Sequence, residues 1–183
     1  MTISHPDAVT FRAARPDDAL CLGVLSTQVF LDTYATRGIR PAVAREVLAL
    51  HSVAVYEALL AEAGVTILVA ECAGHLVGFS QVGDGVGHKQ LPSAAPSELK
   101  RLYVQEGFAG RGVGRDLLRQ AEKSAAALGA DLLWLQVWEG NTRALQFYPR
   151  CGYEDLGGTV YTIEGEDFPN RLFGKRVRHV APA

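Results

Sequence analysis

The stretch Phe108-Ala-Gly-Arg-Gly-Val-Gly-Arg115 lies between two runs of different hydrophobic periodicity. The preceding run, Leu99–Val104, has strand character, and the following run carries apolar side chains at helical spacing as far as Leu128. A glycine-rich turn therefore opens a helix. The first N–H groups of a helix have no acceptor within it, so such a turn presents them to an anion. The glycines that would let the backbone approach that ligand with positive φ are Gly110, Gly112 and Gly114.

The spacing of these glycines excludes two nucleotide-binding motifs. The dinucleotide fingerprint requires Gly-x-Gly-x-x-Gly, but its last position is Arg115 when counted from Gly110 and Leu117 when counted from Gly112. A P-loop ends in Gly-Lys followed by Ser or Thr, which Val113-Gly-Arg-Asp116 does not provide. The turn is therefore expected to serve another anion, and a helix-opening loop without a ligand is the alternative that these residues alone leave open.

The segment Ala109–Gly114 resembles the coenzyme A pyrophosphate loop of the GNAT acetyltransferase superfamily, whose signature is Arg/Gln-x-x-Gly-x-Gly/Ala between a strand and a helix. One position departs from that signature, because Ala109 stands where the family has Arg or Gln. The resemblance implies acetyl-CoA as cosubstrate, bound mainly by the backbone and less firmly at the Ala109 position. The cofactor-binding residues that it implies are Leu102, Tyr103, Val104, Gly110, Arg111, Gly112, Val113, Gly114, Arg115 and Asn141.

A second motif of the same family follows the apolar run Asp131–Trp138, which is typical of a buried strand. The family pattern is Asn-x-x-Ala-x-x-Phe/Leu-Tyr-x-x-x-Gly-Phe/Tyr, and this chain fills every position with Asn141, Ala144, Phe147, Tyr148, Gly152 and Tyr153. Asn141 is either a helix N-cap alone or a cofactor contact as well. Pro149 is expected to end the short helix early, because proline disfavours helical geometry at the residue before it.

The remaining elements fit the order seen in that family. Strands are expected at residues 10–14, 65–72, 75–81, 99–104, 131–138, 157–163 and 171–178, and helices at 15–30, 41–62, 114–128 and after Asn141. The strands 65–72 and 75–81 should form a hairpin that turns at Ala73-Gly74. The resemblance implies an α/β (α+β) GNAT fold: a central mixed, mostly antiparallel sheet of about seven strands, flanked by about four helices, with splayed fourth and fifth strands. Residues 1–183 are expected to form a single domain.

Composition limits the class of protein. With 183 residues, 48% of them hydrophobic, the chain can bury one substantial core, and a formal net charge of −2 favours neither nucleic acid nor an anionic membrane as partner. The three cysteines are widely spaced and form no Cys-x-x-Cys pair, and the sequence shows neither a signal peptide nor a membrane-spanning run. A cytoplasmic protein is therefore expected. The five histidines show no ligand spacing, so no metal is expected.

Acetyl transfer from a thioester to an amine needs a base and an acid. An alkylammonium must lose a proton before it attacks, and the departing thiolate benefits from receiving one. By resemblance, Tyr148 is the acid for the coenzyme A thiolate. By the same resemblance, the pantetheine arm lies along Leu102–Val104, where the Val104 N–H is placed to polarise the thioester oxygen. Aromatic packing is the alternative role of Tyr148.

By resemblance to some GNAT members, which carry a glutamate at this place, the base is expected to be Glu98 at the start of the fourth strand, acting directly or through water. A solvated carboxylate at the strand edge is the alternative role of this residue. Gln136 stands where the branch that acetylates ribosomal-protein N-termini has a glutamate, and an amide cannot accept a proton at neutral pH. Glu139 and bulk water are the other possible bases.

The acceptor is inferred from three segments that resemble polyamine-type bacterial acetyltransferases, Phe30–Tyr34, Glu98–Val104 and Val137–Ala144. A cationic amine would suit carboxylates at Asp32, Asp84 and Glu98, unless these are solvated surface charges. The expected function is acetyl transfer to a small-molecule primary amine, such as a polyamine, by direct attack in a ternary complex. Two alternatives stay open: a non-catalytic acyl-CoA-binding sensor or regulatory domain, and a protein N-terminal acetyltransferase. A homodimer is compatible with the sequence.

Overall fold

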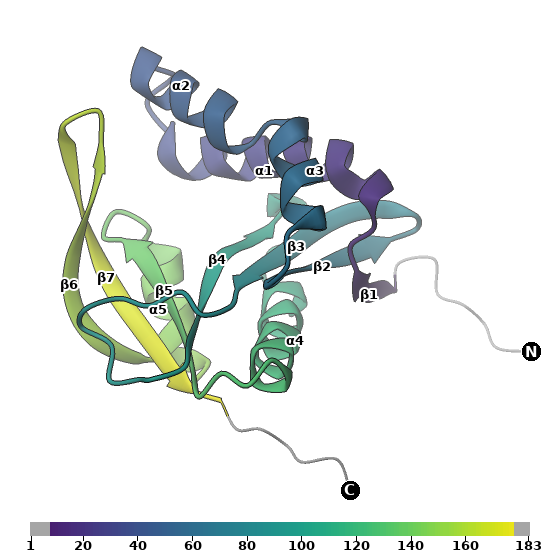
Figure 1. Ribbon diagram of the computed structural model, residues 1–183. Coiled ribbons are helices and arrows are strands. Elements are labelled where there is room, and N and C mark those ends of the chain that lie inside the picture. Colours follow the sequence, from purple (N-terminus) through teal and green to yellow (C-terminus); the bar gives the residue numbers. More distant parts are fainter. Residues whose placement is uncertain (1–7, 178–183) are drawn as a thin grey trace, which may run out of the picture. The chain divides into compact units, whose positions relative to one another are not determined.

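The structure is a computed structural model that describes residues 8–177 (Figure 1). Those residues contain seven strands, five α-helices and two short 3-10 helices. The strands are β1 (Val9–Ala13), β2 (Val65–Cys72), β3 (His75–Gly83), β4 (Pro96–Val104), β5 (Leu132–Trp138), β6 (Glu154–Ile163) and β7 (Glu166–Arg176). The helices are α1 (Ala19–Tyr34), α2 (Pro41–Leu50), α3 (Val53–Ala61), α4 (Val113–Ala127) and α5 (Thr142–Arg150), and the 3-10 turns are Pro16–Asp18 and Glu106–Phe108.

All seven strands belong to one sheet, in the order β1-β2-β3-β4-β5-β7-β6. The β1–β2, β5–β7 and β6–β7 pairs are antiparallel, whereas β4 and β5 are parallel. The parallel register covers Pro96–Glu98 against Leu132–Trp134, and both strands continue beyond it. The expected mixed, mostly antiparallel sheet is therefore confirmed, and the short parallel register agrees with a splayed pair of strands.

The chain divides into two compact units. The first unit comprises the residues up to Gln81 together with Arg101–Gln120, and the second comprises Val82–Lys100 together with the residues from Ala121 onward. Because the boundaries fall inside β3, β4 and α4, these three elements contribute residues to both units. Each unit has hydrophobic core residues of its own.

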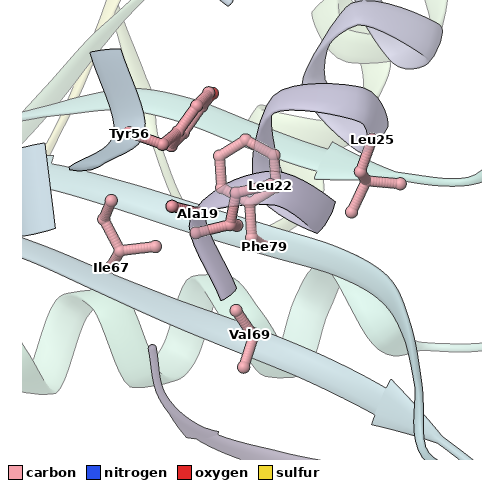
Figure 2. Packing of buried hydrophobic residues seen from close by; sticks show 7 residues of the cluster. All are labelled: Ala19, Leu22, Leu25, Tyr56, Ile67, Val69 and Phe79. Carbon is pink, nitrogen blue, oxygen red and sulfur yellow. The ribbon is translucent and has the colours of Figure 1, made fainter. Parts of the chain in front are cut away.

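The first unit buries both faces of β2 and β3. Figure 2 shows one face, where α1 and α3 pack on the sheet through Ala19, Leu22, Leu25, Tyr56, Ile67, Val69 and Phe79. On the opposite face, the start of α4 packs on the same strands through Leu68, Ala70, Cys72, Val77, Val113 and Leu117. Successive residues of β2 thus face different layers, as a pleated strand requires, and both layers are apolar. Each fully buried aliphatic or aromatic side chain contributes about 1.5–3 kcal/mol to this packing.

The helical region expected at residues 41–62 consists of two helices, α2 and α3, with His51 and Ser52 between them. Ser52 is extended (φ −72°, ψ 159°), which interrupts the helical backbone. The helix α1 approaches this junction at Gly23, where a Cβ atom would lie 3.1 Å from the carbonyl oxygen of His51. The close packing that Gly23 permits places His51 beside Ser26, which is buried on the same helix.

The β2–β3 and β6–β7 hairpins both turn through left-handed residues. As the sequence predicts, β2 and β3 are joined at Ala73-Gly74, with φ values of 50° and 82°. β6 and β7 are joined at Glu164-Gly165, with φ values of 49° and 82°, the pattern of a type I′ turn. This tight turn lets β7 begin at Glu166 rather than at the expected Arg171, and the expected last residue, Arg178, lies outside the described residues.

The second unit has its core around β5 and β7. Its buried residues Leu132, Trp134 and Leu172 pack with the partly buried Val86, Leu91 and Leu156. The indole N–H of Trp134 donates to the carbonyl oxygen of Val86 at 2.7 Å, which holds the connection between β3 and β4 against β5. A buried indole that finds such an acceptor avoids the cost of an unpaired polar group.

Candidate active site

The glycine-rich loop has the geometry of an anion cradle at Gly110 and Gly112. Their φ values are +75° and +89°, and a Cβ atom at either position would meet no heavy atom within 4 Å. The space beside this backbone is therefore open. The helix α4 begins at Val113, and the Asp116 N–H donates to the Gly112 carbonyl oxygen at 3.0 Å. The N–H groups of residues 113–115 precede that bond, so they have no acceptor within the helix and can bind an anion.

The expectation of a positive φ at Gly114 is wrong. This residue lies in the first turn of α4, where the helical backbone has negative φ, and among the described loop residues the left-handed glycines are Gly110 and Gly112. The helix starts at Val113 because that side chain is buried against Leu117 and the sheet. The contribution of Gly114 is therefore an N–H group that no side chain covers.

Positive charge lies close to the loop. Arg111 and Arg115 are exposed, and the guanidinium of Arg111 lies 5.3 Å from the ring centroid of Phe108, which orients it by a cation–π contact. Ala109, at the end of the preceding 3-10 turn, offers no polar side chain. Backbone donors with two arginines beside them suit the oxygens and charge of a pyrophosphate, so the residues present fit that group.

The end of β4 belongs to the same unit as the loop. Leu102 and Val104 pack on the α4 side of the sheet, whereas the ring of Tyr103 packs against Phe79 on the α1 side, with ring centroids 5.5 Å apart. Close to this point β3 carries Gly78, where a Cβ atom would lie 2.8 Å from the Tyr103 carbonyl oxygen. A side chain at position 78 would push the strands apart, so glycine fixes the path of β4 at Tyr103.

The helix α5 begins at Asn141 as its cap and continues through Pro149. The Oδ1 atom of Asn141 accepts a hydrogen bond from the Ala144 N–H at 3.0 Å. The expectation that Pro149 ends this helix early is wrong, because α5 extends to Arg150. Proline in the last turn removes only its own N–H donor, a cost that the helix end tolerates.

Gly152 ends α5 instead. It has φ +84°, and its N–H donates to the Pro149 carbonyl oxygen at 3.0 Å. The N–H of Tyr153 donates to the Tyr148 carbonyl oxygen at 3.1 Å, which completes a Schellman arrangement. The backbone of Tyr148 is therefore tied directly to the end of its helix.

Tyr148 lies in an aromatic group of the second unit, with 7% of its surface exposed. Its ring centroid lies 5.2 Å from that of Phe147, 5.6 Å from that of Tyr153 and 6.1 Å from that of Phe173. Phe173 comes from β7, so the group joins α5 to the sheet. The packing restricts the Tyr148 ring to a narrow range of positions.

Lys175 of β7 braces the same group. Its ammonium donates to the Cys151 carbonyl oxygen at 3.0 Å and to the Glu122 carboxylate at 2.9 and 3.0 Å. Burial, together with the Glu122 carboxylate, raises the pKa of Tyr153 well above its usual value, so the Tyr153 hydroxyl stays protonated. The end of α5 is thus held by a hydrogen bond from the ion-paired Lys175 as well as by its own cap.

Glu98 lies in β4 opposite Trp134 and is 7% exposed. The ammonium of Lys100 lies 2.8 Å from its carboxylate, and the Lys100 side chain is 46% exposed. Glu98 is thus shielded from solvent, in contrast to the solvated strand-edge carboxylate considered from the sequence. The nearby Asp84 is exposed and accepts a hydrogen bond from the Ser97 hydroxyl at 3.0 Å.

A buried polar cluster of the first unit was not expected from the sequence. The Tyr56 hydroxyl donates to Oγ of Ser26 at 2.6 Å, and that Oγ lies 2.5 Å from Nδ1 of His51. Burial, with a smaller effect of the Arg101 charge, lowers the pKa of His51 to about 4, so the ring is neutral at pH 7. The Ser26 hydroxyl has no other hydrogen-bond partner among the described residues, so we assign its proton to Nδ1 and the ring proton of the neutral His51 to Nε2.

The predicted site residues divide between the two units. The first unit holds the glycine loop and Leu102–Val104, and the second holds Glu98, Asn141 and Tyr148. Within residues 8–177, no group of three or more His, Cys, Asp or Glu side chains is arranged to hold a metal ion. In the same part of the chain, no helix has both the length and the apolar character needed to cross a membrane.

Two curated proteins are similar in sequence to part of this chain. The chain is 34% identical over 70 residues to an uncharacterized N-acetyltransferase in the pepI 3′ region of Lactobacillus delbrueckii subsp. lactis, a match that covers 38% of this chain and 40% of that protein. It is 32% identical over 92 residues to streptothricin acetyltransferase of Streptomyces lavendulae, covering 50% of this chain and 46% of that protein. The chain thus spans less than half the length of these relatives.

A solved structure shares the fold over nearly the whole chain. The PaiA N-acetyltransferase from Thermoplasma acidophilum, in complex with coenzyme A, matches with a TM-score of 0.70 over 92% of this chain and 99% of that chain, at 20% identity. The sequence pattern of the Acetyltransferase (GNAT) family matches residues 32–153, a range that contains both the glycine loop and the Asn141–Tyr153 motif. The chain therefore belongs to the GNAT family of acetyltransferases.

Proposed function

We propose that this protein is an N-acetyltransferase that moves an acetyl group from acetyl-CoA to a primary amine of a small molecule, by direct attack in a ternary complex. The observation that supports the proposal is the loop at Gly110 and Gly112, whose positive φ values and open surroundings suit the binding of an anion, such as a pyrophosphate, at the start of α4. The family match supports the same activity.

The residues proposed to hold the cosubstrate are of two kinds. The N–H groups of residues 113–115 bind the pyrophosphate, with Arg111 and Arg115 adding positive charge. The backbone of Leu102–Val104 pairs with the pantetheine arm as a neighbouring strand would, and the Val104 N–H donates to the thioester oxygen. Asn141 is proposed as a further contact in addition to its observed role as a cap. When bound, acetyl-CoA supplies an acetyl carbon activated as a thioester.

The proposed mechanism has two proton transfers, and each involves a different side chain. Glu98, directly or through water, accepts the proton that the amine nitrogen loses as the new C–N bond forms. The Tyr148 hydroxyl donates a proton to the sulfur as the C–S bond breaks, so that the products are an amide and free coenzyme A. Exchange with solvent then returns the proton to Tyr148 and removes it from Glu98. Glu139, which is exposed, and bulk water are the other candidates for the base.

The proposed activity is tested by following free thiol release from acetyl-CoA in the presence of polyamines, small amines, amino acids, aminoglycosides and peptides with free N-termini. We expect release that depends on the amine, with a single acetyl group added to the product by mass spectrometry. Tight acetyl-CoA binding without thiol release for any amine would support a sensor or regulatory domain instead. Turnover confined to peptides would support a protein N-terminal acetyltransferase.

Replacing Gly112 by alanine is expected to raise the Kd for acetyl-CoA about tenfold, because a left-handed backbone costs a residue with a Cβ about 1–2 kcal/mol. The space around Gly112 is open, so the effect would come from the backbone and not from a clash. Isothermal titration calorimetry measures the change. The matched control is Gly107→Ala, at a nearby glycine that also has open surroundings but lacks a positive φ. An unchanged Kd for Gly112→Ala would show that this loop does not bind the cosubstrate.

A polyamine acceptor is one form of the proposal, and the candidate carboxylates are Asp32, Asp84 and Glu98. In the structure Asp32 is exposed on α1, and Asp84 accepts a hydrogen bond from Ser97. Glu98 already contacts the ammonium of Lys100 at 2.8 Å. A polyamine would therefore have to displace Lys100 to reach the most buried of the three carboxylates.

A further inference from the structure

Among the described residues, no carboxylate forms an ion pair with Arg101. Its Nη1 donates to Oε1 of Gln81 at 2.5 Å, and its Nη2 donates to the Leu50 carbonyl oxygen at 3.2 Å. The guanidinium carbon lies 5.9 Å from the ring centroid of Tyr56. These neutral partners hold the guanidinium in place without neutralising it, and its fork retains further N–H donors. A partly buried cation held in this way favours an anionic ligand.

His51 supplies a second hydrogen-bond donor in the same unit. It directly follows Leu50, whose carbonyl oxygen Arg101 contacts, and the charge of Arg101 acts on the imidazole. Since Nδ1 accepts from Ser26, the proton is on Nε2, and within residues 8–177 that nitrogen has no hydrogen-bond acceptor. A guanidinium and a neutral N–H donor together are complementary to a carboxylate and repel an ammonium group.

Aromatic rings pack around His51. The ring of Phe30 lies 4.7 Å from the rings of His51 and Tyr34, and the ring of Tyr103 stacks on His51 at 6.4 Å with an interplanar angle of 14°. Apolar ring surfaces lower the local dielectric constant, so an ionic contact made among them is stronger than one made in water. The same rings offer packing surface to the carbon skeleton of a ligand.

The cluster shares its strand with the proposed cosubstrate site. Arg101 and Tyr103 alternate along β4 with Leu102 and Val104, whose backbone is proposed to pair with the pantetheine arm. Tyr103 faces the α1 side of the sheet, and Leu102 and Val104 face the α4 side. Neighbouring residues of a strand are about 3.3 Å apart, so the backbone of Arg101 adjoins the strand segment that would hold the thioester.

We propose that Arg101 and His51 bind a carboxylate of the acceptor, so that the acceptor is a small amine that also carries a carboxylate, as a free amino acid does. This inference rests on the proposed acetyltransferase function and narrows its substrate class. Arg101 is a specificity residue in this arrangement: it binds the carboxylate, which stays ionised, while the amine nitrogen forms the C–N bond. The proton and the thiol leave as in the general reaction.

Pairs of acceptors that differ only by a carboxylate test the proposal in the wild-type protein. Ornithine with putrescine is one pair, and lysine with cadaverine is another. We expect kcat/KM to be about 10- to 100-fold higher for the amino acid of each pair, the range that charge-assisted hydrogen bonds contribute. Equal values, or a preference for the diamines, would overturn the proposal. Absence of thiol release with every amine would contradict the acetyltransferase function itself, which separates the two failures.

Substitution of Arg101 tests the assignment of the residue. Arg101→Gln is expected to raise KM for ornithine about 10- to 100-fold without lowering kcat/KM for putrescine, and Arg101→Lys should recover part of the loss for ornithine. The matched control is Arg176→Gln, because Arg176 also makes side-chain hydrogen bonds, to Asp131 and to the Pro92 carbonyl oxygen. Equal losses for both acceptors in Arg101→Gln, with acetyl-CoA affinity retained, would show that Arg101 only holds the fold and would overturn the assignment.

Discussion

Tyr148→Phe is expected to lower kcat about 100-fold while the Kd for acetyl-CoA stays within about threefold of the wild-type value. General acid catalysis contributes about 10²- to 10⁴-fold, and the lower end applies here because a thiolate with a reference pKa of about 8.5 is a fair leaving group even without a proton. The buried ring packing should survive the change, since phenylalanine keeps the contacts with Tyr153 and Phe173. Steady-state thiol release and calorimetry measure the two quantities.

The neighbouring tyrosine supplies the matched control. Tyr153 is buried, packs on Tyr148, and its hydroxyl has no hydrogen-bond partner among the described residues. Tyr153→Phe therefore removes a hydroxyl from the same aromatic group without breaking a hydrogen bond, and kcat should stay within about twofold of wild type. If Tyr148→Phe leaves kcat unchanged, or if both variants lose activity equally, Tyr148 is not the acid and its role is aromatic packing.

The features that sequence predicts best are those that depend on neighbouring residues in the chain. The β2–β3 hairpin turns at Ala73-Gly74 as expected, because alternating apolar residues and a glycine are both local signals. The loop before α4 is also local: two glycines need positive φ, and the helix that follows is amphipathic. The sheet order as a whole came from the family resemblance, since pairing between distant strands leaves no comparable local signal.

Two local predictions failed because a neighbouring signal was stronger. Proline disfavours helical geometry at the preceding residue, but α5 nevertheless continues past Pro149. The helix ends at Gly152, whose left-handed backbone allows the hydrogen bonds of a Schellman motif. At Gly114 the glycine spacing suggested a third left-handed position, but burial of Val113 against the core starts the helix before it. In both cases a tertiary or capping contact decided the backbone geometry.

The cluster around His51 shows what sequence reasoning does not reach. Ser26, His51, Tyr56 and Arg101 come from α1, the α2–α3 junction, α3 and β4, and only tertiary packing brings them together. The available signals were weak: a histidine inside a predicted helix, and a serine on a helix face that is otherwise apolar. Neither signal gives a reason to join residues that are far apart in the chain.

The free energy of unfolding is expected to fall more steeply with acid in the wild-type protein than in His51→Gln. In the folded protein burial and Arg101 lower the pKa of His51 to about 4, whereas an unfolded histidine titrates near its reference value of about 6.5. Between about pH 6.5 and pH 4, His51 therefore binds a proton in the unfolded chain but stays neutral in the folded chain. The stability that depends on neutral His51 is fully present above about pH 6.5, declines below it, and is lost as the pH falls through about 4.

The expected size of this effect follows from the pKa difference. Between about pH 7.5 and pH 4.5, the wild-type protein should lose about 2.5 kcal/mol more unfolding free energy than His51→Gln, measured by urea denaturation at both pH values. Carboxylates titrate in the same window in both proteins, so the difference between the two isolates the histidine. Glutamine is the chosen replacement because its amide oxygen can still accept from Ser26. The exposed His75, replaced by glutamine, is the control and should retain the wild-type pH dependence. An identical pH dependence in His51→Gln and wild type would show that the His51 ring is solvated. The Nε2–H group would then donate to water, which would weaken its proposed role in binding a ligand.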